Sequence, residues 1–357
     1  MFKLASASEN TSIINRDFSI GTKFFLLFIA LICTFYFALI AGPAHISPAQ
    51  ILHLFLTLPE SRTSSDWYIF ADIRLPRVLL ASFVGGALGC SGAVLQGLLR
   101  NPLADPGLIG VSSGAALAAS FIILLSTSLF PVYFMNFGLW SVPAAGLLGG
   151  LGAVLILYLF ATRKGSTSIA TIILGGVAIS AFAGALTGII VTTANDQTLR
   201  NITFWSLGSL AGASWPELEA FLPFLIAGGI CVLSLPHGLN ALQLGEAEAQ
   251  HMGTSVQKIK RLSLLATACM TGAAVSVSGI IGFIGLLVPH LARLGFSPDY
   301  RIVLPASALL GATLLLLADT LARLLISPAE LPVGIVTATI GAPCFFLLLL
   351  KKQGSPL

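Results

Sequence analysis

The segment RLPRVLLASFVGGALGCSGAVLQGLLRNPLADPGLIGVSSGAALAAS, residues 74–120, decides the fold of this chain. It opens on two arginines, runs through closely spaced small residues, breaks at Asn101-Pro102, and resumes after Asp105-Pro106-Gly107. Glycines weaken a helix but let other backbones approach, which is how helices associate where lipid removes the hydrophobic driving force. The segment therefore predicts two membrane helices that meet at a polar, proline-containing turn, the first of them packed inside a bundle.

The composition of the whole chain agrees with a membrane protein. Of its 357 residues, 56% are hydrophobic and 9% are charged, whereas an average soluble protein has about 25% charged residues. Lipid must therefore be the solvent for most of the surface. The sequence has no run rich in lysine and arginine and no zinc-type spacing, so nucleic acid is not an expected partner.

Ten apolar segments are long enough to cross a bilayer, which needs about 20 helical residues. The segment 262–292 has no charged residue and would be about 46 Å long as one helix, too long for a single crossing. A break near residues 279–282 divides it into two spans. The other expected spans are residues 24–41, 78–99, 107–130, 138–162, 169–193, 217–235, 302–326 and 331–350. We expect an all-α polytopic domain over residues 23–352, with short cytoplasmic tails at 1–22 and 353–357.

The basic residues indicate the orientation in the membrane. An even number of spans places both termini on one side, and that side receives 13 of the 18 lysines and arginines. The positive-inside bias predicts that both termini are cytoplasmic. The longest polar connections are then residues 45–72 and 196–216 outside and residues 236–258 inside.

No catalytic motif is present. The sequence lacks HExxH, GxSxG and the GxxxxGK[ST] loop that binds ATP, so any ATP and Mg²⁺ must be bound by a partner chain. We expect this chain to bind no cofactor or metal and not to be an enzyme. A membrane-embedded enzyme and an ATP-independent secondary transporter or channel remain as alternatives from other classes.

One acid lies deep inside a predicted span. Asp319 has Arg323 four residues later, on the same face of the helix. A proton or ion relay would need such a group. An internally satisfied pair near the outer surface is the simpler interpretation, and we prefer it.

The inner loop at residues 239–255 is the most informative connection. Gly245 and Gly253 bracket the sequence EAEAQHM, which predicts a helix of one to two turns. A helix this short is marginal alone, so we expect packing to hold it, most simply against another protein. An ordinary solvated loop is the alternative.

In these features the chain resembles the FecCD-type permeases of bacterial ABC importers, a family that includes the vitamin B12 permease. The similarity covers most of the chain after Arg74, and the residues before it show little specific similarity. The shared motifs are RLPR (74–77), SGAVLQGLLRNPLADPGLIGVSSGA (91–115), STSIAT (166–171), LGEAEAQHMG (244–253), GFIGLLVPHLARL (282–294), LLLLADTLARL (314–324) and ELPVGIVTATIGAPCFFLLLLKK (330–352).

The resemblance implies an importer permease of the type II architecture. It implies a homodimer of ten-helix subunits in the bacterial inner membrane, two cytoplasmic ABC ATPase subunits, and an external or periplasmic substrate-binding protein. Arg74, Arg77 and Arg323 match the outward-facing arginines that receive acidic residues of the binding protein. Anchoring at the membrane interface is the alternative for each of them.

The resemblance also implies the inner functional elements. Asn101, Pro102 and Leu103 match one cytoplasmic gate loop, and Ser166, Thr167 and Ser168 match the other; plain connectors are the alternative. The coupling helix that fits a cleft in the ATPase matches Gly245, Glu246, Ala247, Glu248, Ala249, Gln250, His251, Met252 and Gly253. The expected cargo is an iron chelate, either a ferric siderophore or haem, and cobalamin is the alternative within the family.

Overall fold

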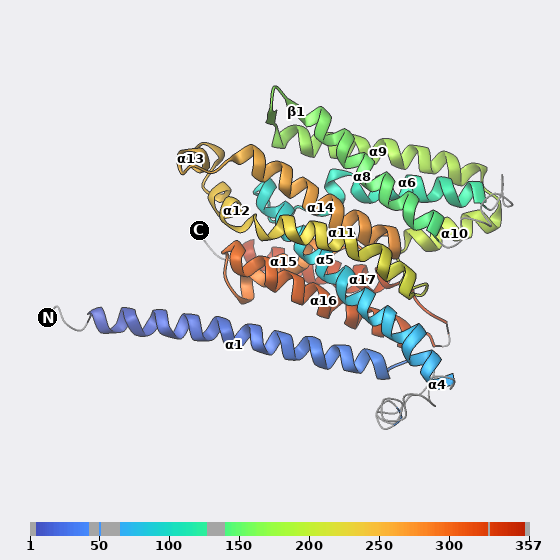
Figure 1. Ribbon diagram of the computed structural model, residues 1–357, viewed down its shortest axis with the longest axis horizontal. Coiled ribbons are helices and arrows are strands. Elements are labelled where there is room, and N and C mark those ends of the chain that lie inside the picture. Colours follow the sequence, from blue (N-terminus) through green and yellow to red (C-terminus); the bar gives the residue numbers. More distant parts are fainter. Residues whose placement is uncertain (1–4, 43–49, 51–64, 127–139, 328, 354–357) are drawn as a thin grey trace.

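The computed structural model describes residues 5–42, 50, 65–126, 140–327 and 329–353. Most of the predicted outer loop at residues 45–72 lies outside the described residues. So do the end of the third predicted span after residue 126, the start of the fourth before residue 140, and residues 354–357 of the C-terminal tail. The described part is a bundle of helices with one small hairpin (Figure 1).

Each of the ten predicted spans corresponds to a helix in the described part of the chain. Seven helices have the length and composition to cross a membrane, and three shorter apolar helices complete the set. The helices are α1 (Ala5–Ile40), α5 (Leu75–Leu99), α6 (Val111–Leu124), α8 (Ser141–Ala161), α9 (Ile169–Thr193), α11 (Trp215–Leu233), α14 (Val256–Ser278), α15 (Ile284–Gly295), α16 (Tyr300–Leu325) and α17 (Val333–Gln353).

The predicted break near residues 279–282 is confirmed. Helix α14 ends at Ser278, where Gly279 takes a positive φ of 67°. A Cβ at this position would collide with the carbonyl oxygen of Trp205, so glycine is required both for its φ and for the space. The Ser278 carbonyl accepts a hydrogen bond from the Ser209 amide at 2.7 Å, which keeps the broken end satisfied inside the bundle.

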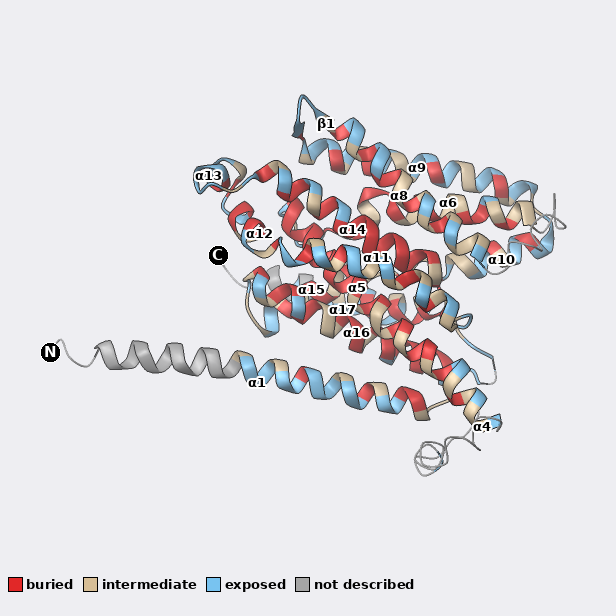
Figure 2. Ribbon diagram, viewed as in Figure 1, coloured by how far each residue is buried: buried red, intermediate tan, exposed pale blue. Residues whose placement is uncertain are grey.

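Helices α5 and α14 form the centre of the bundle. Most residues of α5 are buried, including four of its five glycines, as the opening segment of the sequence predicted. Figure 2 shows this central burial, with exposed residues spread over α1 and α9 at the periphery. In a single chain these outer faces are apolar, as expected for surfaces that meet lipid or another subunit.

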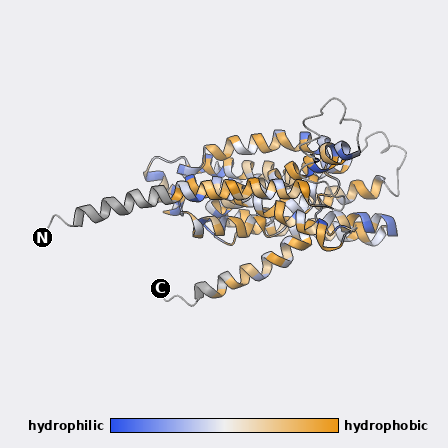
Figure 3. Cartoon of the chain, turned by 90° about the horizontal axis from the view of Figure 1, so that it is seen from below, coloured by the Kyte–Doolittle hydropathy of each residue, from blue (hydrophilic) through white to orange (hydrophobic). Residues whose placement is uncertain are grey.

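Short elements close the two ends of the bundle. One end carries α12 (Pro236–Gln243), α13 (Glu246–His251) and the hairpin of β1 (Thr162–Arg163) and β2 (Ser166–Thr167); we call it the α13 end (Figure 1). The opposite end carries α4 (Ser65–Tyr68), the π-helical turn η1 (Ile69–Arg74) and α10 (Asp196–Ser206). A 3₁₀ turn, η2 (Pro106–Ile109), follows α5. Hydrophilic residues gather toward both ends, and hydrophobic residues dominate between them (Figure 3).

The N-terminal segment is helical. Helix α1 begins at Ala5, and its part that is apolar enough to cross a membrane is Ile20–Ile40, so the cytoplasmic tail stays a prediction. Helix α1 starts and α17 finishes toward the α13 end (Figure 1), which is the arrangement that an even number of spans requires.

Candidate functional site

The predicted coupling segment contains the expected short helix. Helix α13 spans Glu246–His251, and Gly245 and Gly253 bracket it with positive φ values of 126° and 78°. Ala249 faces the protein and is buried, whereas Met252 is 56% exposed. The remaining outward positions, Ala247, Glu248, Gln250 and His251, are also exposed. An exposed face on so short a helix fits a surface that another protein covers, although its role as a coupling element stays a prediction.

The second predicted gate loop, Ser166 to Ser168, is strand β2 of the hairpin and the residue after it. Thr167 is buried, and its hydroxyl lies 2.9 Å from the hydroxyl of Thr162 across the hairpin. Its amide donates to Oε1 of Gln257 on α14 at 2.9 Å. Ser168 caps α9, because its hydroxyl accepts a hydrogen bond from the Thr171 amide. The hairpin is therefore a defined unit held against α14.

Lys260 connects this hairpin to α13. Its ammonium donates to the Thr167 carbonyl at 2.6 Å and forms a salt bridge of 2.7 Å with Oε2 of Glu246. Sequence reasoning counted Lys260 only as one of the inner basic residues. Helical spacing could have singled it out, because Lys260 shares the buried face of Val256 and Leu264, whereas Lys258 lies off that face and is exposed.

The first predicted gate loop is a tight turn at the end of α5. Arg100 ends the helix in the left-handed region, with a φ of 50°. The side-chain oxygen of Asn101 accepts a hydrogen bond from the Leu103 amide at 2.9 Å, and the Asn101 carbonyl accepts one from the Ala104 amide. Pro102 and Leu103 are exposed. The loop thus has a fixed backbone and presents its proline and leucine outward.

Gln96 holds the first gate loop against α15. Its Nε2 donates to the carbonyls of Ala104 and Leu286, each at 3.2 Å. Its Oε1 accepts a hydrogen bond of 2.6 Å from Arg293, which also lies over the Tyr300 ring. Gln96 is buried, and the sequence analysis did not single it out. A polar residue in the glycine-rich helix was the available signal.

We expect Gln96→Leu to lower the free energy of unfolding by about 1–3 kcal/mol, because it leaves two buried carbonyls and an arginine without their partner. Thermal unfolding of the purified chain in detergent measures this. The matched control is Gln197→Leu, since Gln197 is an exposed glutamine on α10. Equal stability of the two variants would contradict the role assigned to Gln96.

Helix α12 joins the coupling segment to α5 and α16. Gln243 donates to the Gly97 carbonyl at 3.2 Å, close to the first gate loop. Asn240 donates to Asp299 at 2.6 Å and accepts from the Tyr300 amide at 3.0 Å. Burial alone would raise the pKa of Asp299. The hydrogen bonds that its carboxylate accepts from the Arg301 amide and Asn240 outweigh this effect and hold the pKa below its ordinary value. The inner loop at residues 239–255 thus contacts α5 beside the first predicted gate loop, through Gln243. It also contacts Lys260, which bonds to the second predicted gate loop, through Glu246.

The three predicted docking arginines meet at the end opposite α13, but the structure buries them. Arg74, Arg77 and Arg323 are 4%, 6% and 3% exposed. Arg77 donates to Asp319 at 2.9 Å and to Glu330 at 2.9 Å. Arg323 forms a salt bridge of 3.2 Å with Asp319, which confirms that these two side chains pair within the chain; their place near the outer surface stays a prediction.

Two of these arginines cap the end of α1. Arg74 donates to the carbonyls of Leu39 and Ile40 at 2.7 Å, and Arg323 donates to those of Ala38 and Ala41 at 3.0 Å. Cations at a helix C-terminus complement its dipole and satisfy its last carbonyls. The expected outward-facing rim is therefore not free in this chain. Docking through these residues stays a prediction, and it would require some of the internal bonds to open.

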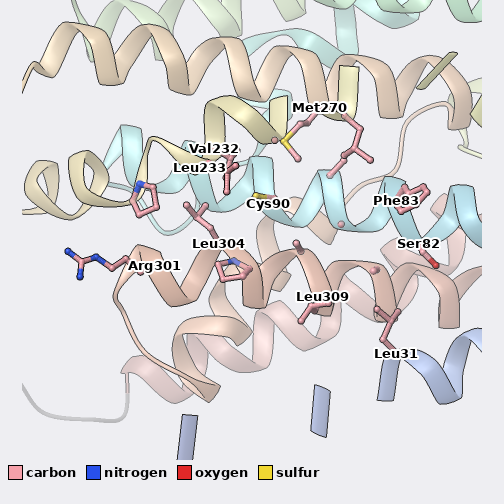
Figure 4. Close-up of a pocket in the computed structure, with 18 residues that line it drawn as sticks. Leu31, Ser82, Phe83, Cys90, Val232, Leu233, Met270, Arg301, Leu304 and Leu309 are labelled. Carbon is pink, nitrogen blue, oxygen red and sulfur yellow. The ribbon is translucent and has the colours of Figure 1, made fainter. Parts of the chain in front are cut away.

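An apolar cavity of about 530 Å³ lies between α1, α5, α11 and α16. Phe83, Met270 and Leu304 are among its lining residues, and Arg301 lies at one end of it (Figure 4). This lining suits hydrocarbon and offers no set of polar groups for a chelate. Among the residues that the structure describes, no three His, Cys, Asp or Glu side chains are grouped to hold a metal ion.

Comparisons with known proteins point to one transport family. The model of the FecCD transport family matches residues 29–351. The hemin transport system permease protein HmuU of Yersinia pestis is 46% identical over 300 residues, which cover 84% of this chain and 88% of that protein. The cobalamin import system permease protein BtuC of Halobacterium salinarum is 44% identical over 80% of this chain and 74% of that protein.

A solved structure has the same fold. It is an ABC transporter assigned to the metal-chelate type, in an inward-facing conformation, and it is 32% identical to this chain. The superposition has a TM-score of 0.78 and covers 93% of this chain and 99% of the other. The likeness therefore extends over nearly the full chain.

Proposed function

The chain belongs to the FecCD transport family, and we propose that it imports an iron chelate, either haem or a ferric siderophore, by ATP-driven alternating access. It is the permease subunit of an ABC importer, with the ATPase on a partner chain. The observation that carries the choice of cargo is the 46% identity with a hemin permease over 84% of the chain. Cobalamin is the second candidate, because permeases named for cobalamin or vitamin B12 are 44% and 38% identical.

We propose two copies of this chain, two ABC ATPase subunits and one external binding protein as the working assembly. The exposed face of α13, with Met252 outward, supports an ATPase contact at the α13 end. Three cavities of the described residues, of about 530, 550 and 640 Å³, all have apolar linings, which supports a polar path between two copies rather than through one of these cavities. Exposed apolar residues on α9 and α17 give surfaces for lipid or a second copy.

The proposed orientation places the α13 end in the cytoplasm. The bias of 13 basic residues against 5, from the full set of 18, supports this orientation. The binding protein would then meet the end that carries α4 and the arginine cluster. ATP binding and hydrolysis would act on α13, and the loops at residues 101–103 and 166–168 would open or close the inner side.

Uptake into liposomes tests the proposal. Vesicles carry this chain with its ATPase, the binding protein is added outside, and haem, ferric siderophores and cobalamin are offered in parallel. We expect accumulation of an iron chelate that disappears without ATP or without the binding protein.

Three outcomes separate the alternatives. Uptake of cobalamin alone would replace the proposed cargo and keep the rest. Proton- or ion-driven flux in vesicles that hold this chain alone would contradict the ATP-driven mechanism. Failure of all three cargoes, with an ATPase that copurifies and turns over, would reject each proposed cargo.

A further inference from the structure

Lys260 is a buried charge with partners on two separate elements. It is 1% exposed, and its ammonium contacts the Thr167 carbonyl and the Glu246 carboxylate at 2.6 and 2.7 Å. A buried ammonium is costly unless it is paired and hydrogen-bonded. In the described part of the chain, Glu246 is the carboxylate that forms a salt bridge with it. The position of this lysine therefore depends on where Glu246 lies.

The two partners belong to different parts of the proposed machinery. Glu246 is the first residue of α13, and its side chain is 34% exposed, so a protein bound to α13 can reach it. Thr167 belongs to the hairpin and is fastened to it by the Thr162 hydroxyl. A shift of the Thr167 backbone is thus a shift of the hairpin as a unit. Lys260 is the residue that touches both.

We propose that Lys260 is a positioning residue that transmits displacement of α13 to the gate hairpin at residues 162–168. The proposal rests on the proposed function, because it assigns a route between the two elements that this function couples. If a partner moves Glu246, the buried ammonium of Lys260 either follows its counter-charge or remains unpaired. If the ammonium follows Glu246, the Thr167 carbonyl loses its hydrogen-bond donor. If the ammonium stays in place, the carbonyl keeps that donor. The hairpin has a different set of bonds in each case.

The link is also selective between the two gate loops. The loop at residues 101–103 is held by Gln96 and Arg293, neither of which bonds to α13. The hairpin is held by Gln257 and Lys260 of α14, and only the second of these bonds to α13. Loss of Lys260 should therefore uncouple the hairpin and leave the first loop in place.

The test compares Lys260→Met with Lys258→Met in the full complex of permease and ATPase. Methionine keeps most of the volume of the lysine side chain, and the Glu246 carboxylate that loses its partner is 34% exposed and can be solvated. Lys258 is the matched control, because it lies on the same helix and is exposed. Uptake per ATP hydrolysed measures coupling, and copurification of the ATPase confirms assembly.

A second readout follows the hairpin itself and needs no cargo. Cysteine replaces the exposed Arg163 in a background without the five native cysteines. We expect its maleimide labelling rate to change on ATP binding in the parent and in Lys258→Met. In Lys260→Met this change should vanish, and uptake per ATP should fall about tenfold, the size expected for loss of a charge-assisted hydrogen bond. A purely structural role would not remove the nucleotide response of an assembled complex.

Glu246→Gln tests the role of Lys260 if the Lys260→Met variant does not fold. This variant removes the charge at a partly exposed side chain. Like Lys260→Met, it should reduce the change in the maleimide labelling rate of the hairpin on ATP binding. Where both variants fold, the double variant should lose no more than Lys260→Met alone. A normal labelling response in either single variant would overturn the proposal. Absence of uptake by the parent complex, with an intact labelling response, would instead reject the proposed cargo and leave this inference standing.

Discussion

Replacement of Asp319 by alanine is expected to lower the free energy of unfolding by about 3–5 kcal/mol, because it strands two buried arginines without their shared counter-charge. Asp319 is fully buried and accepts from Arg77 through both carboxylate oxygens. It also pairs with Arg323 four residues later on α16. Without it, among the described residues Arg77 keeps the salt bridge to the partly exposed Glu330, and Arg323 keeps hydrogen bonds to neutral oxygens.

Thermal unfolding in detergent, together with the yield of monodisperse protein, measures this loss. Glu219→Ala is the control, since Glu219 is an exposed carboxylate on α11 near the same end of the bundle. Asp319→Asn should be milder than alanine, because the amide oxygen still accepts a hydrogen bond from Arg77. If the free energy of unfolding of Asp319→Ala lies within about 0.5 kcal/mol of that of Glu219→Ala, which is the range typical of surface substitutions, the Asp319 carboxylate does not stabilise this end of the bundle.

The sequence identified the members of this cluster but not their arrangement. The family resemblance selected Arg74, Arg77 and Arg323 and implied that all three lie on the outer side. Their burial follows from pairing across more than two hundred residues, between Arg77 and both Asp319 and Glu330. Nothing local in the sequence specifies such pairs. For this reason, the sequence could not show that the three arginines expected to face outward are already engaged in bonds within the chain.

The helices were predictable because their causes are local. The length of an apolar run decides whether it crosses a bilayer, and charge-free length alone required a break in the segment 262–292. The short helix α13 was also predictable, because Gly245 and Gly253 bracket it in the sequence, and in the structure both adopt positive φ. Helical spacing places Lys260 on one face of α14 with Val256 and Leu264, but its link to the hairpin was not predictable, because that link depends on which face of α14 meets the hairpin. Burial of that face is a property of the bundle and not of the segment.

The second large effect concerns the contact between α5 and α15. We expect Gly92→Leu to destabilise the chain by about 3 kcal/mol or more, the upper range for overpacking, because the collision is with backbone. A Cβ on Gly92 would lie 2.6 Å from the carbonyl carbon and 2.7 Å from the Cα of Gly285. It would also collide with the Gly285 carbonyl oxygen. Neither helix can relieve this by a rotamer change, so the two backbones must separate.

This separation should reach the first gate loop. Gln96 lies one turn beyond Gly92 on the same face of α5, and it donates to Leu286, the residue next to Gly285. Helices pushed apart at Gly92 would therefore break the bond by which Gln96 holds α15, so Gly92→Leu should reduce uptake as well as stability. Gly152→Leu on α8 is the control, since a Cβ there meets no atom within 4 Å. Gly92→Ala should fall between the two in thermal unfolding. An unchanged melting temperature for Gly92→Leu would mean that α5 and α15 are not in backbone contact, and the proposed support of the gate loop would fail with it.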